Sequence, residues 1–348
     1  MASQVPALAL ATGVCERIGK RKSMEDATSV FCALSTSDAT VEEQLTAASA
    51  HGERRKSVEL SVEHARDNVL GCFGVFDGHG GIACADYCSV AIPQLLASHE
   101  KTGTDAELAL LEVFAETDKR LREYLDRNFA DTLTYQSGCT ASVVVMSGRY
   151  DDKITLTCAN VGDTRTLLVR RDGSYIPLSH DHVPHLESEK LRIENAGGFV
   201  APPPMRADSS SVRVLGSLAV TRSLGDFAFK LPKVASWGTP EKPITEDLVS
   251  GIPDIKQQEI YPNDQLLLIA CDGIWDVFSR TEAAEFVRKG LNAVDKDPEA
   301  RCKSAVEKCD QVAAQLIEEA ISRGTKDNCS CVLVRIFPRS KSRMCAIS

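Results

Sequence analysis

No stretch of the sequence is apolar for the length that a membrane-spanning helix requires, and Met1 to Ala11 lack the basic residues that open a signal peptide. We therefore expect a protein of the cytoplasm or nucleus that is not secreted. The net charge of -9 leaves no excess of basic residues, which argues against nucleic acid as the main partner. The sequence also lacks an internal repeat, a P-loop and a dinucleotide-binding fingerprint.

The thirteen cysteines include no Cys-x-x-Cys pair, which is the spacing typical of many metal and redox sites. Cys72, Cys158 and Cys271 lie within apolar runs, which indicates reduced thiols in a core. Cys84 and Cys88 are four residues apart. Soft-metal binding is one interpretation of this pair, but one helical face of small buried side chains is favoured, so we assign these cysteines no chemistry.

The 348 residues are 43% hydrophobic and 26% charged, which is enough for a large core in one big domain or two. Strand-like segments lie at residues 69–76, 141–146, 154–161, 166–170, 266–270 and 331–336. Helical periodicity predicts amphipathic helices over 108–125 and 305–317. Short turns such as Asp172-Gly173 favour antiparallel pairing, and strand runs interrupted by long helices indicate helices layered over packed sheets.

Three apolar runs each end at an aspartate that lies beside a glycine. The runs are Phe73 to Gly81, Thr155 to Asp163 and Leu266 to Asp276. A charged side chain at the end of a buried strand is tolerated only where the chain leaves the apolar layer, so these strand ends mark a cleft. Carboxylates gathered there repel one another unless cations neutralise them, and oxygen ligands suit Mg²⁺ or Mn²⁺. A single Asp-Gly pair is more typical of a tight turn, but three copies and a late Asp327-Asn328 favour a metal site.

Seven short motifs follow one another in an order found in one protein family. They are Arg21-x-x-Met24-Glu25-Asp26, Asp77-Gly78-His79-Gly80-Gly81, Ser137-Gly138-x-Thr140-Ala141, Gly162-Asp163-x-Arg165, Gly216-x-Leu218-Ala219-Val220-x-Arg222, Asp272-Gly273-x-Trp275-Asp276 and Asp327-Asn328. Through these motifs the sequence resembles the PPM family, the metal-dependent serine/threonine protein phosphatases of type 2C. The resemblance implies an α+β fold, a four-layer αββα sandwich with two central antiparallel β-sheets flanked by helices.

The resemblance also implies a centre of two Mg²⁺ or Mn²⁺ ions, with a weaker third, at one end of the sandwich. The matching positions make Asp77 the bridging ligand, add the Gly78 carbonyl at one ion, and place Asp272 and Asp327 at the other. The residues expected in the second shell or at the third ion are Glu25, Asp26, Asp163 and Asp276. Two such ions would activate one water or hydroxide and neutralise the phosphoryl oxygens, which hydrolyses phosphoserine and phosphothreonine in protein substrates.

Two residues match the family's catalytic positions. Arg21 offers a planar guanidinium for bidentate phosphate binding, and His79 is expected to protonate the departing serine or threonine oxygen. Surface charge and a turn are the ordinary interpretations of these two residues, and their place within the motifs outweighs both. A cysteine-based tyrosine phosphatase is excluded because no cysteine has the required phosphate-loop setting. The alternative is a catalytically inactive scaffold of the same fold that binds protein partners.

The organisation expected is an N-terminal extension at 1–13, a phosphatase domain at 14–337 and a basic tail at 338–348. The domain carries a polar insertion at about 35–67 and an extended flap loop at about 199–214. Ahead of that loop, Val183 stands where many relatives have lysine. Ser57 follows a basic cluster that kinases recognise, although a solvated charged loop is the favoured interpretation. Cys345 is the fourth residue from the end and lies in a farnesylation box, so membrane association is expected, with a frayed tail as the alternative. The sequence leaves the oligomeric state open.

Overall fold

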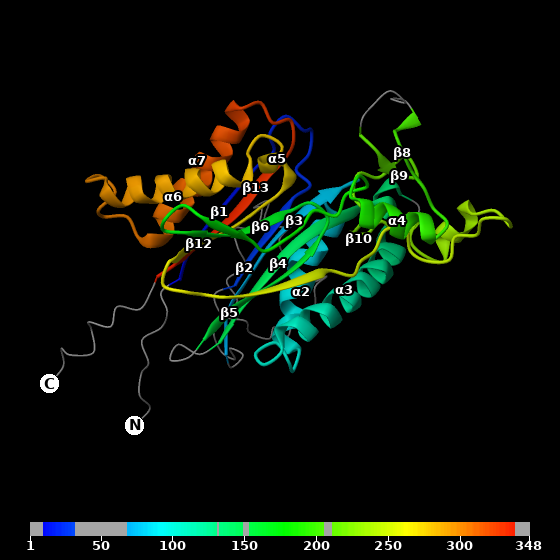
Figure 1. Ribbon diagram of the computed structural model, residues 1–348, viewed down its shortest axis with the longest axis horizontal. Coiled ribbons are helices and arrows are strands. Elements are labelled where there is room, and N and C mark those ends of the chain that lie inside the picture. Colours follow the sequence, from blue (N-terminus) through cyan, green and yellow to red (C-terminus); the bar gives the residue numbers. More distant parts are fainter. Residues whose placement is uncertain (1–9, 32–67, 131, 149–152, 205–210, 338–348) are drawn as a thin grey trace.

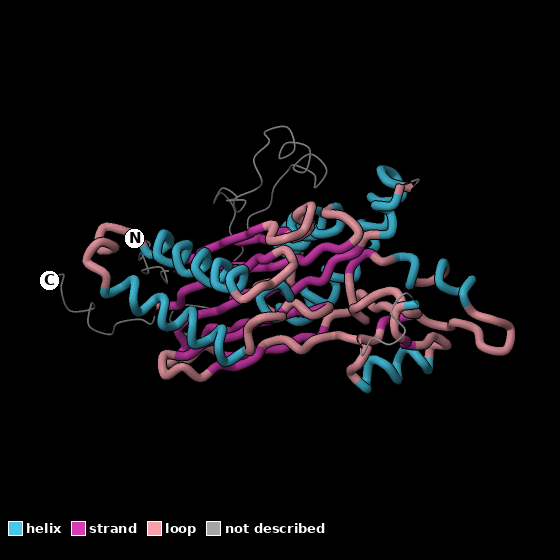
Figure 2. Tube along the Cα trace, turned by 90° about the horizontal axis from the view of Figure 1, so that it is seen from above, coloured by secondary structure: helices cyan, strands magenta, loops and turns pink. Residues whose placement is uncertain are grey.

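Two antiparallel β-sheets pack face to face and helices cover both outer faces, as the tube in Figure 2 shows. The computed structural model describes residues 10–31, 68–130, 132–148, 153–204 and 211–337. One sheet has the order β1 (Leu10–Arg17), β13 (Cys329–Ile336), β12 (Asp264–Ala270), β6 (Arg165–Arg170) and β7 (Tyr175–Pro177). The other has the order β11 (Asp254–Glu259), β5 (Ile154–Val161), β4 (Gly138–Gly148), β3 (Val69–His79) and β2 (Ala27–Phe31), with β10 (Leu224–Gly225) paired to β4.

The helices form the two outer layers (Figure 1). The β3 sheet is covered by α2 (Ala83–Ser98) and α3 (Ala106–Phe129), and the β12 sheet by α6 (Arg280–Lys296) and α7 (Ala305–Ser322). A smaller unit with its own apolar cluster lies at one end of the sandwich and contains α4 (Glu187–Asn195), β8 (Val200–Ala201) and β9 (Arg213–Val214). The short helical turns are α5 (Asp272–Trp275) and the 3₁₀ segments Leu133–Gln136, Phe227–Phe229 and Lys233–Trp237.

The central strands are apolar throughout because both of their faces are buried. In β12, Leu266 and Leu268 pack toward α6 and α7, whereas Leu267 and Ile269 pack against the other sheet. Alternate side chains of a strand point to opposite faces, so a continuous apolar run supplies two layers of core at once. The same alternation in β3 places Phe73 between the sheets. The predicted four-layer αββα sandwich is therefore confirmed.

The predicted strands and both predicted helices are present, with ends that differ by a few residues. The strand β1 begins at Leu10 and pairs with β13 along its whole length. Residues 10–13, which the sequence analysis placed in the N-terminal extension, therefore belong to a sheet of the domain. The described cysteines are free, and Cys84 and Cys88 are buried on α2. That burial confirms the interpretation of this pair as core residues.

Candidate metal centre

Strand ends from both sheets meet at one end of the sandwich. Asp77 is the ninth residue of β3, and Ala27, at the start of β2, pairs with Phe76, so Asp26 lies beside Asp77. In the facing sheet, Ala270 of β12 pairs with Cys331 of β13, which brings the Cys271-Asp272 end of one strand beside the Asp327-Asn328 approach to the other. Antiparallel pairing of neighbouring strands thus gathers carboxylates that are far apart in the sequence.

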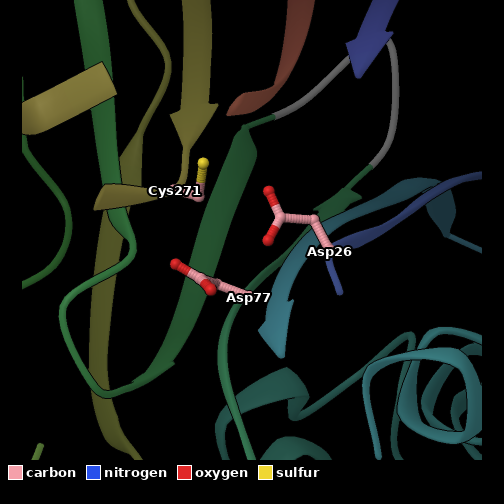
Figure 3. Close-up of side chains that lie close together, drawn as sticks. All are labelled: Asp26, Asp77 and Cys271. Carbon is pink, nitrogen blue, oxygen red and sulfur yellow. The ribbon is translucent and has the colours of Figure 1, made fainter. Parts of the chain in front are cut away.

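Among the described residues, Asp26, Asp77 and Cys271 form a group that could hold a metal ion. One ligand atom of each residue lies within 4.8 Å of the others. In Figure 3 the two carboxylates approach each other from the β2 and β3 side, and the thiol faces them from the end of β12. The sandwich therefore places the aspartates of the first two motifs opposite Cys271, which precedes the Asp272 motif, across a shared space between the two sheets.

The carboxylates of this site resist losing their protons in the absence of a cation. Burial raises the pKa of Asp77 well above its usual range, and the charges of Asp272 and Asp26 raise it further. Burial likewise raises the pKa of Asp272, with added repulsion from Asp163 and Asp327. Such mutual repulsion in a buried space is removed when a divalent cation binds. The group has the charge and the donor atoms that a hard cation requires.

Asp26 adds a second sign that the site lacks a counter-charge. Its carboxylate is only 2% exposed, and Oδ2 has no hydrogen bond of normal geometry among the described residues. Burial raises the pKa of Asp26 to about 6, although the nearby Ser330 and Cys271 side chains partly offset that effect. A buried acceptor without a donor is costly unless a cation or water satisfies it. The residues present therefore fit a hard-metal site.

Cys271 is a site neighbour that the sequence analysis did not identify. Its side chain is fully buried, as expected of a core thiol. Burial raises its pKa well above the usual range, and the Asp26 and Asp77 carboxylates add to the effect. The thiol therefore keeps its proton, and a protonated sulfur is a poor ligand for Mg²⁺ or Mn²⁺. The thiol faces the carboxylates while its Sγ donates weakly to the Asn328 carbonyl at 3.5 Å and accepts from the Ser330 N–H at 3.1 Å.

The loop that carries the first motif is fastened to the start of β13. Asn328 Oδ1 accepts a hydrogen bond of 2.7 Å from the Glu25 N–H, and Asn328 Nδ2 donates to the carbonyls of Ile18 and Ser23. Close backbone contact is also required at Gly78, where a Cβ would lie 2.2 Å from the Glu25 carbonyl oxygen. The loop is thus held in one position, with the Glu25 carboxylate accepting from the Gly81 N–H at 3.1 Å.

Arg21 lies at the exposed edge of the site and forms an ion pair with Asp327. Burial lowers the pKa of Arg21, but the hydrogen bond to Asp327 and the charges of Asp327, Asp272 and Asp77 together outweigh it and leave the pKa above its usual value. The guanidinium side chain is 58% exposed. It can therefore meet an anion that arrives from solvent.

His79 lies deeper and contacts a residue that the sequence analysis did not single out. Its Nε2 is 2.7 Å from Oδ2 of Asp226. Burial lowers the pKa of His79, but the charge and hydrogen bond of Asp226, together with the charges of Asp163 and Glu25, outweigh it, so the pKa is above its usual value. The sequence contained only a weak signal for this partner, the Gly225-Asp226 pair, because the residues before it include Thr221, Arg222 and Ser223 and form no apolar run.

Asp163 and Asp276 flank Asp272 on the other side of the site. Burial raises the pKa of Asp163 to about 6, and it also raises the pKa of Asp276, with a further contribution from Asp327. The Asp276 N–H donates to the Asp272 carbonyl at 2.8 Å, one turn along α5. The structure thus places all eight predicted carboxylate and carbonyl positions of the metal site around one end of the sandwich.

Three comparisons with known proteins agree on the family. A family model described as Protein phosphatase 2C matches residues 43–329. The Schizosaccharomyces pombe protein named Protein phosphatase 2C homolog 2 is 38% identical over 238 residues, which are 68% of this chain and 57% of that protein. The Arabidopsis thaliana protein named Probable protein phosphatase 2C 69 is 33% identical over 290 residues, 83% of this chain and 68% of that protein. The chain belongs to the protein phosphatase 2C family, as its motifs predicted.

Solved structures show the same fold. The serine-threonine phosphatase 2C from Toxoplasma gondii superposes with a TM-score of 0.66 at 19% identity, covering 96% of this chain and 98% of that chain. A second phosphatase structure, from a pathogenic strain of Toxoplasma gondii, has a TM-score of 0.66 and 22% identity over 95% of this chain and 93% of that chain. Among the curated relatives, this chain spans from 49% to 74% of their length.

Some sequence predictions concern residues outside the described ranges. The insertion at 35–67, Ser57, the central part of the flap loop, the tail and Cys345 all lie there. Phosphorylation of Ser57 and prenylation of Cys345 stay predictions. In the described part of the chain, no helix is long and apolar enough to cross a membrane.

Proposed function

We propose that this chain hydrolyses phosphoserine and phosphothreonine in protein substrates with the help of two Mg²⁺ or Mn²⁺ ions. One observation carries the proposal. Carboxylates from both sheets converge around Asp77, with Asp26 buried and Asp77, Asp272 and Asp327 partly exposed, and burial and mutual repulsion raise the pKa of Asp77 well above the usual range. A structural role does not explain such an arrangement, because carboxylates that repel one another in a poorly solvated space oppose folding. Family membership favours the same conclusion.

The residues that would hold the ions follow from the motif positions. Asp77 would bridge the two ions, the Gly78 carbonyl would bind one, and Asp272 and Asp327 would bind the other. The residues that would surround them, or hold a weaker third ion, are Glu25, Asp26, Asp163 and Asp276. When bound, two divalent ions supply positive charge at the phosphoryl oxygens and a nucleophilic water of lowered pKa.

The chain's own residues would act on the phosphate group and on its leaving oxygen. Arg21 is exposed and carries several N–H donors, so it can bind two phosphoryl oxygens while it remains near Asp327. His79 would donate a proton to the serine or threonine oxygen as the ester bond breaks. An alkoxide is a poor leaving group, so this proton transfer matters for the natural substrates.

The test is phosphate release from a phosphothreonine peptide with millimolar Mn²⁺ or Mg²⁺, followed by the same assay with EDTA. We expect turnover that EDTA abolishes, and Asp272→Asn should reduce it at least about 100-fold because a ligand charge is lost. Asp126→Asn is the matched control, since Asp126 is exposed on α3. A folded wild-type chain that binds metal but releases no phosphate would refute catalysis and support the inactive scaffold. Near-normal activity of Asp272→Asn at low metal concentration would refute the site assignment.

A further inference from the structure

Gly138, the first residue of β4, lies between His79 and the loop that carries Asp226. In the sheet, Gly138 of β4 pairs with His79 on one side and with Gly225 of β10 on the other. The chain leaves β10 immediately before Asp226, whose carboxylate crosses the β4 backbone at this point and reaches His79 Nε2 at 2.7 Å. Two segments 147 residues apart in the sequence thus meet across one position of a central strand.

This contact requires the absence of a side chain at position 138. A Cβ built on Gly138 would lie 2.2 Å from Asp226 Oδ2 and 2.7 Å from His79 Nε2. Real Cβ atoms do not approach other heavy atoms that closely, so any other residue would separate the pair or shift the strand. Gly138 therefore leaves the space in which the carboxylate and the imidazole meet.

Asp226 is held in this position at a cost in backbone energy. Its φ and ψ angles are 50° and 39°, in the left-handed region that residues other than glycine seldom adopt. The residue is 1% exposed, its N–H donates to the Ser137 carbonyl at 3.0 Å, and Ser223 Oγ donates to its Oδ2 at 2.5 Å. The loop is braced further by Asp118 of α3, which accepts from the Gly225 N–H at 2.8 Å.

The hydrogen bond fixes which edge of the imidazole is available for chemistry. A carboxylate only accepts, so Nε2 of His79 donates to Asp226, and the two ring nitrogens lie on different edges of the ring. The His79 side chain is 31% exposed, whereas that of Asp226 is 2% exposed. With Nε2 engaged in the interior, Nδ1 is the nitrogen left to transfer a proton to a leaving oxygen.

We propose that Asp226 is a positioning residue for the reaction: it holds His79 through Nε2 so that Nδ1 delivers the proton to the departing serine or threonine oxygen. The inference rests on the proposed function, because it assumes that His79 is the proton donor. A substrate whose leaving group is stable as an anion, such as p-nitrophenyl phosphate, gains little from that proton. An effect on His79 alone therefore depends on the leaving group, whereas damage to the metal site affects every substrate.

The experiment compares a phosphothreonine peptide with p-nitrophenyl phosphate in the presence of Mn²⁺. For His79→Asn we expect a fall in kcat of about 100-fold or more on the peptide and less than about threefold on p-nitrophenyl phosphate. Asp226→Asn should show the same selectivity, with a fall of about tenfold or more on the peptide. The double variant should be no slower than His79→Asn, because residues that act as a unit are not additive.

Asp264→Asn is the matched control, since Asp264 is a buried carboxylate at the start of β12, in the other sheet from His79, and accepts hydrogen bonds from Arg170 Nε and the Tyr261 N–H. We expect lower thermal stability and an unchanged ratio of the two activities. Ser223→Ala removes one hydrogen bond to Asp226 and tests the same idea in case Asp226→Asn does not fold. It should slow the peptide reaction several-fold and leave p-nitrophenyl phosphate unaffected.

The results distinguish a failure of the Asp226 positioning role from a failure of the proposed phosphatase function. Suppose that His79→Asn is selective for the peptide. An unchanged ratio of peptide to p-nitrophenyl phosphate activity in Asp226→Asn would then refute the positioning role alone. If Asp226→Asn does not fold, the same result in Ser223→Ala would refute it. An equal fall on both substrates in a folded Asp226→Asn would also refute it. An unchanged ratio in His79→Asn would refute the proton-donor assignment and the inference together, while metal-dependent turnover would still support a phosphatase.

Discussion

Glu189 offers the sharpest test of how the end unit is attached to the sandwich. This residue of α4 is 3% exposed. It accepts hydrogen bonds from Arg222 at 2.8 Å and from Arg192 at 3.0 Å. Arg222 also donates to Asp254 at 2.7 Å, at the start of β11. A buried carboxylate thus joins the unit that contains α4 to the edge of a central sheet.

The pKa of Glu189 gives the size of this contribution. Burial by itself would raise the pKa, but the hydrogen bond from Arg222 and the charge of Arg192 lower it from 4.5 to about 2. Each unit of difference between the folded and unfolded pKa is equivalent to about 1.4 kcal/mol, so the lowered pKa of Glu189 corresponds to about 3 kcal/mol of folding free energy at neutral pH. We expect Glu189→Gln to lose roughly that amount, since both arginines then keep only their other partners.

The pH dependence has a definite sign. The folded-state pKa is lower than the unfolded-state pKa, so the stabilisation is fully present above pH 4.5 and is lost as the pH falls toward about 2. The assay is urea denaturation of the wild type and of Glu189→Gln at pH 7 and at pH 4. The difference in unfolding free energy between them should be largest at pH 7 and smaller at pH 4.

Glu285→Gln is the control for removal of a carboxylate. Glu285 pairs with Lys289 at 2.7 Å in an exposed i, i+4 arrangement on α6, where ion pairs contribute little. We expect a much smaller change for this variant. A Glu189→Gln difference that is the same at both pH values, or no larger than that of Glu285→Gln, would show that the buried pairs do not stabilise the fold in this way.

Two further predictions concern the metal and the phosphate. Mn²⁺ or Mg²⁺ at about 100 times its dissociation constant should stabilise the wild type by about 2.7 kcal/mol, seen as a rise in melting temperature. Asp77→Asn should abolish that rise, and an equal rise in this variant would contradict the assignment of Asp77 as a metal ligand. Arg21→Ala should raise KM for a phosphopeptide about tenfold or more with a smaller effect on kcat, because it removes a charged hydrogen-bonding group that binds the phosphate. Steady-state kinetics would show this, and an unchanged KM would contradict phosphate binding by Arg21.

Local pattern was sufficient to predict much of the fold. Strands such as Ile154–Val161 are marked by β-branched and apolar residues, and α7 is marked by helical periodicity. Only the Cys84–Cys88 part of α2 was interpreted as helical, because the helix is buried on most sides and therefore has no polar face to define its period. The helix α6 did carry a signal, the Ser279 and Glu282 capping box, that the sequence analysis did not use.

The residues of the candidate site fall into two groups, those that local sequence identifies and those whose contacts form only in the folded chain. The aspartates proposed to bind metal can be found from sequence because each lies at or beside an end of a buried strand, so the signal is local. Asp226 and Asn328 act through partners 147 and 303 residues away, and those contacts exist only after β10 pairs with β4 and β13 lies beside the first motif. Local residue chemistry identifies the candidate ion ligands, but the residues that hold His79 and the first-motif loop in place depend on which strands become neighbours. The leaving-group test of Asp226 therefore examines the part of the site that only the folded chain reveals.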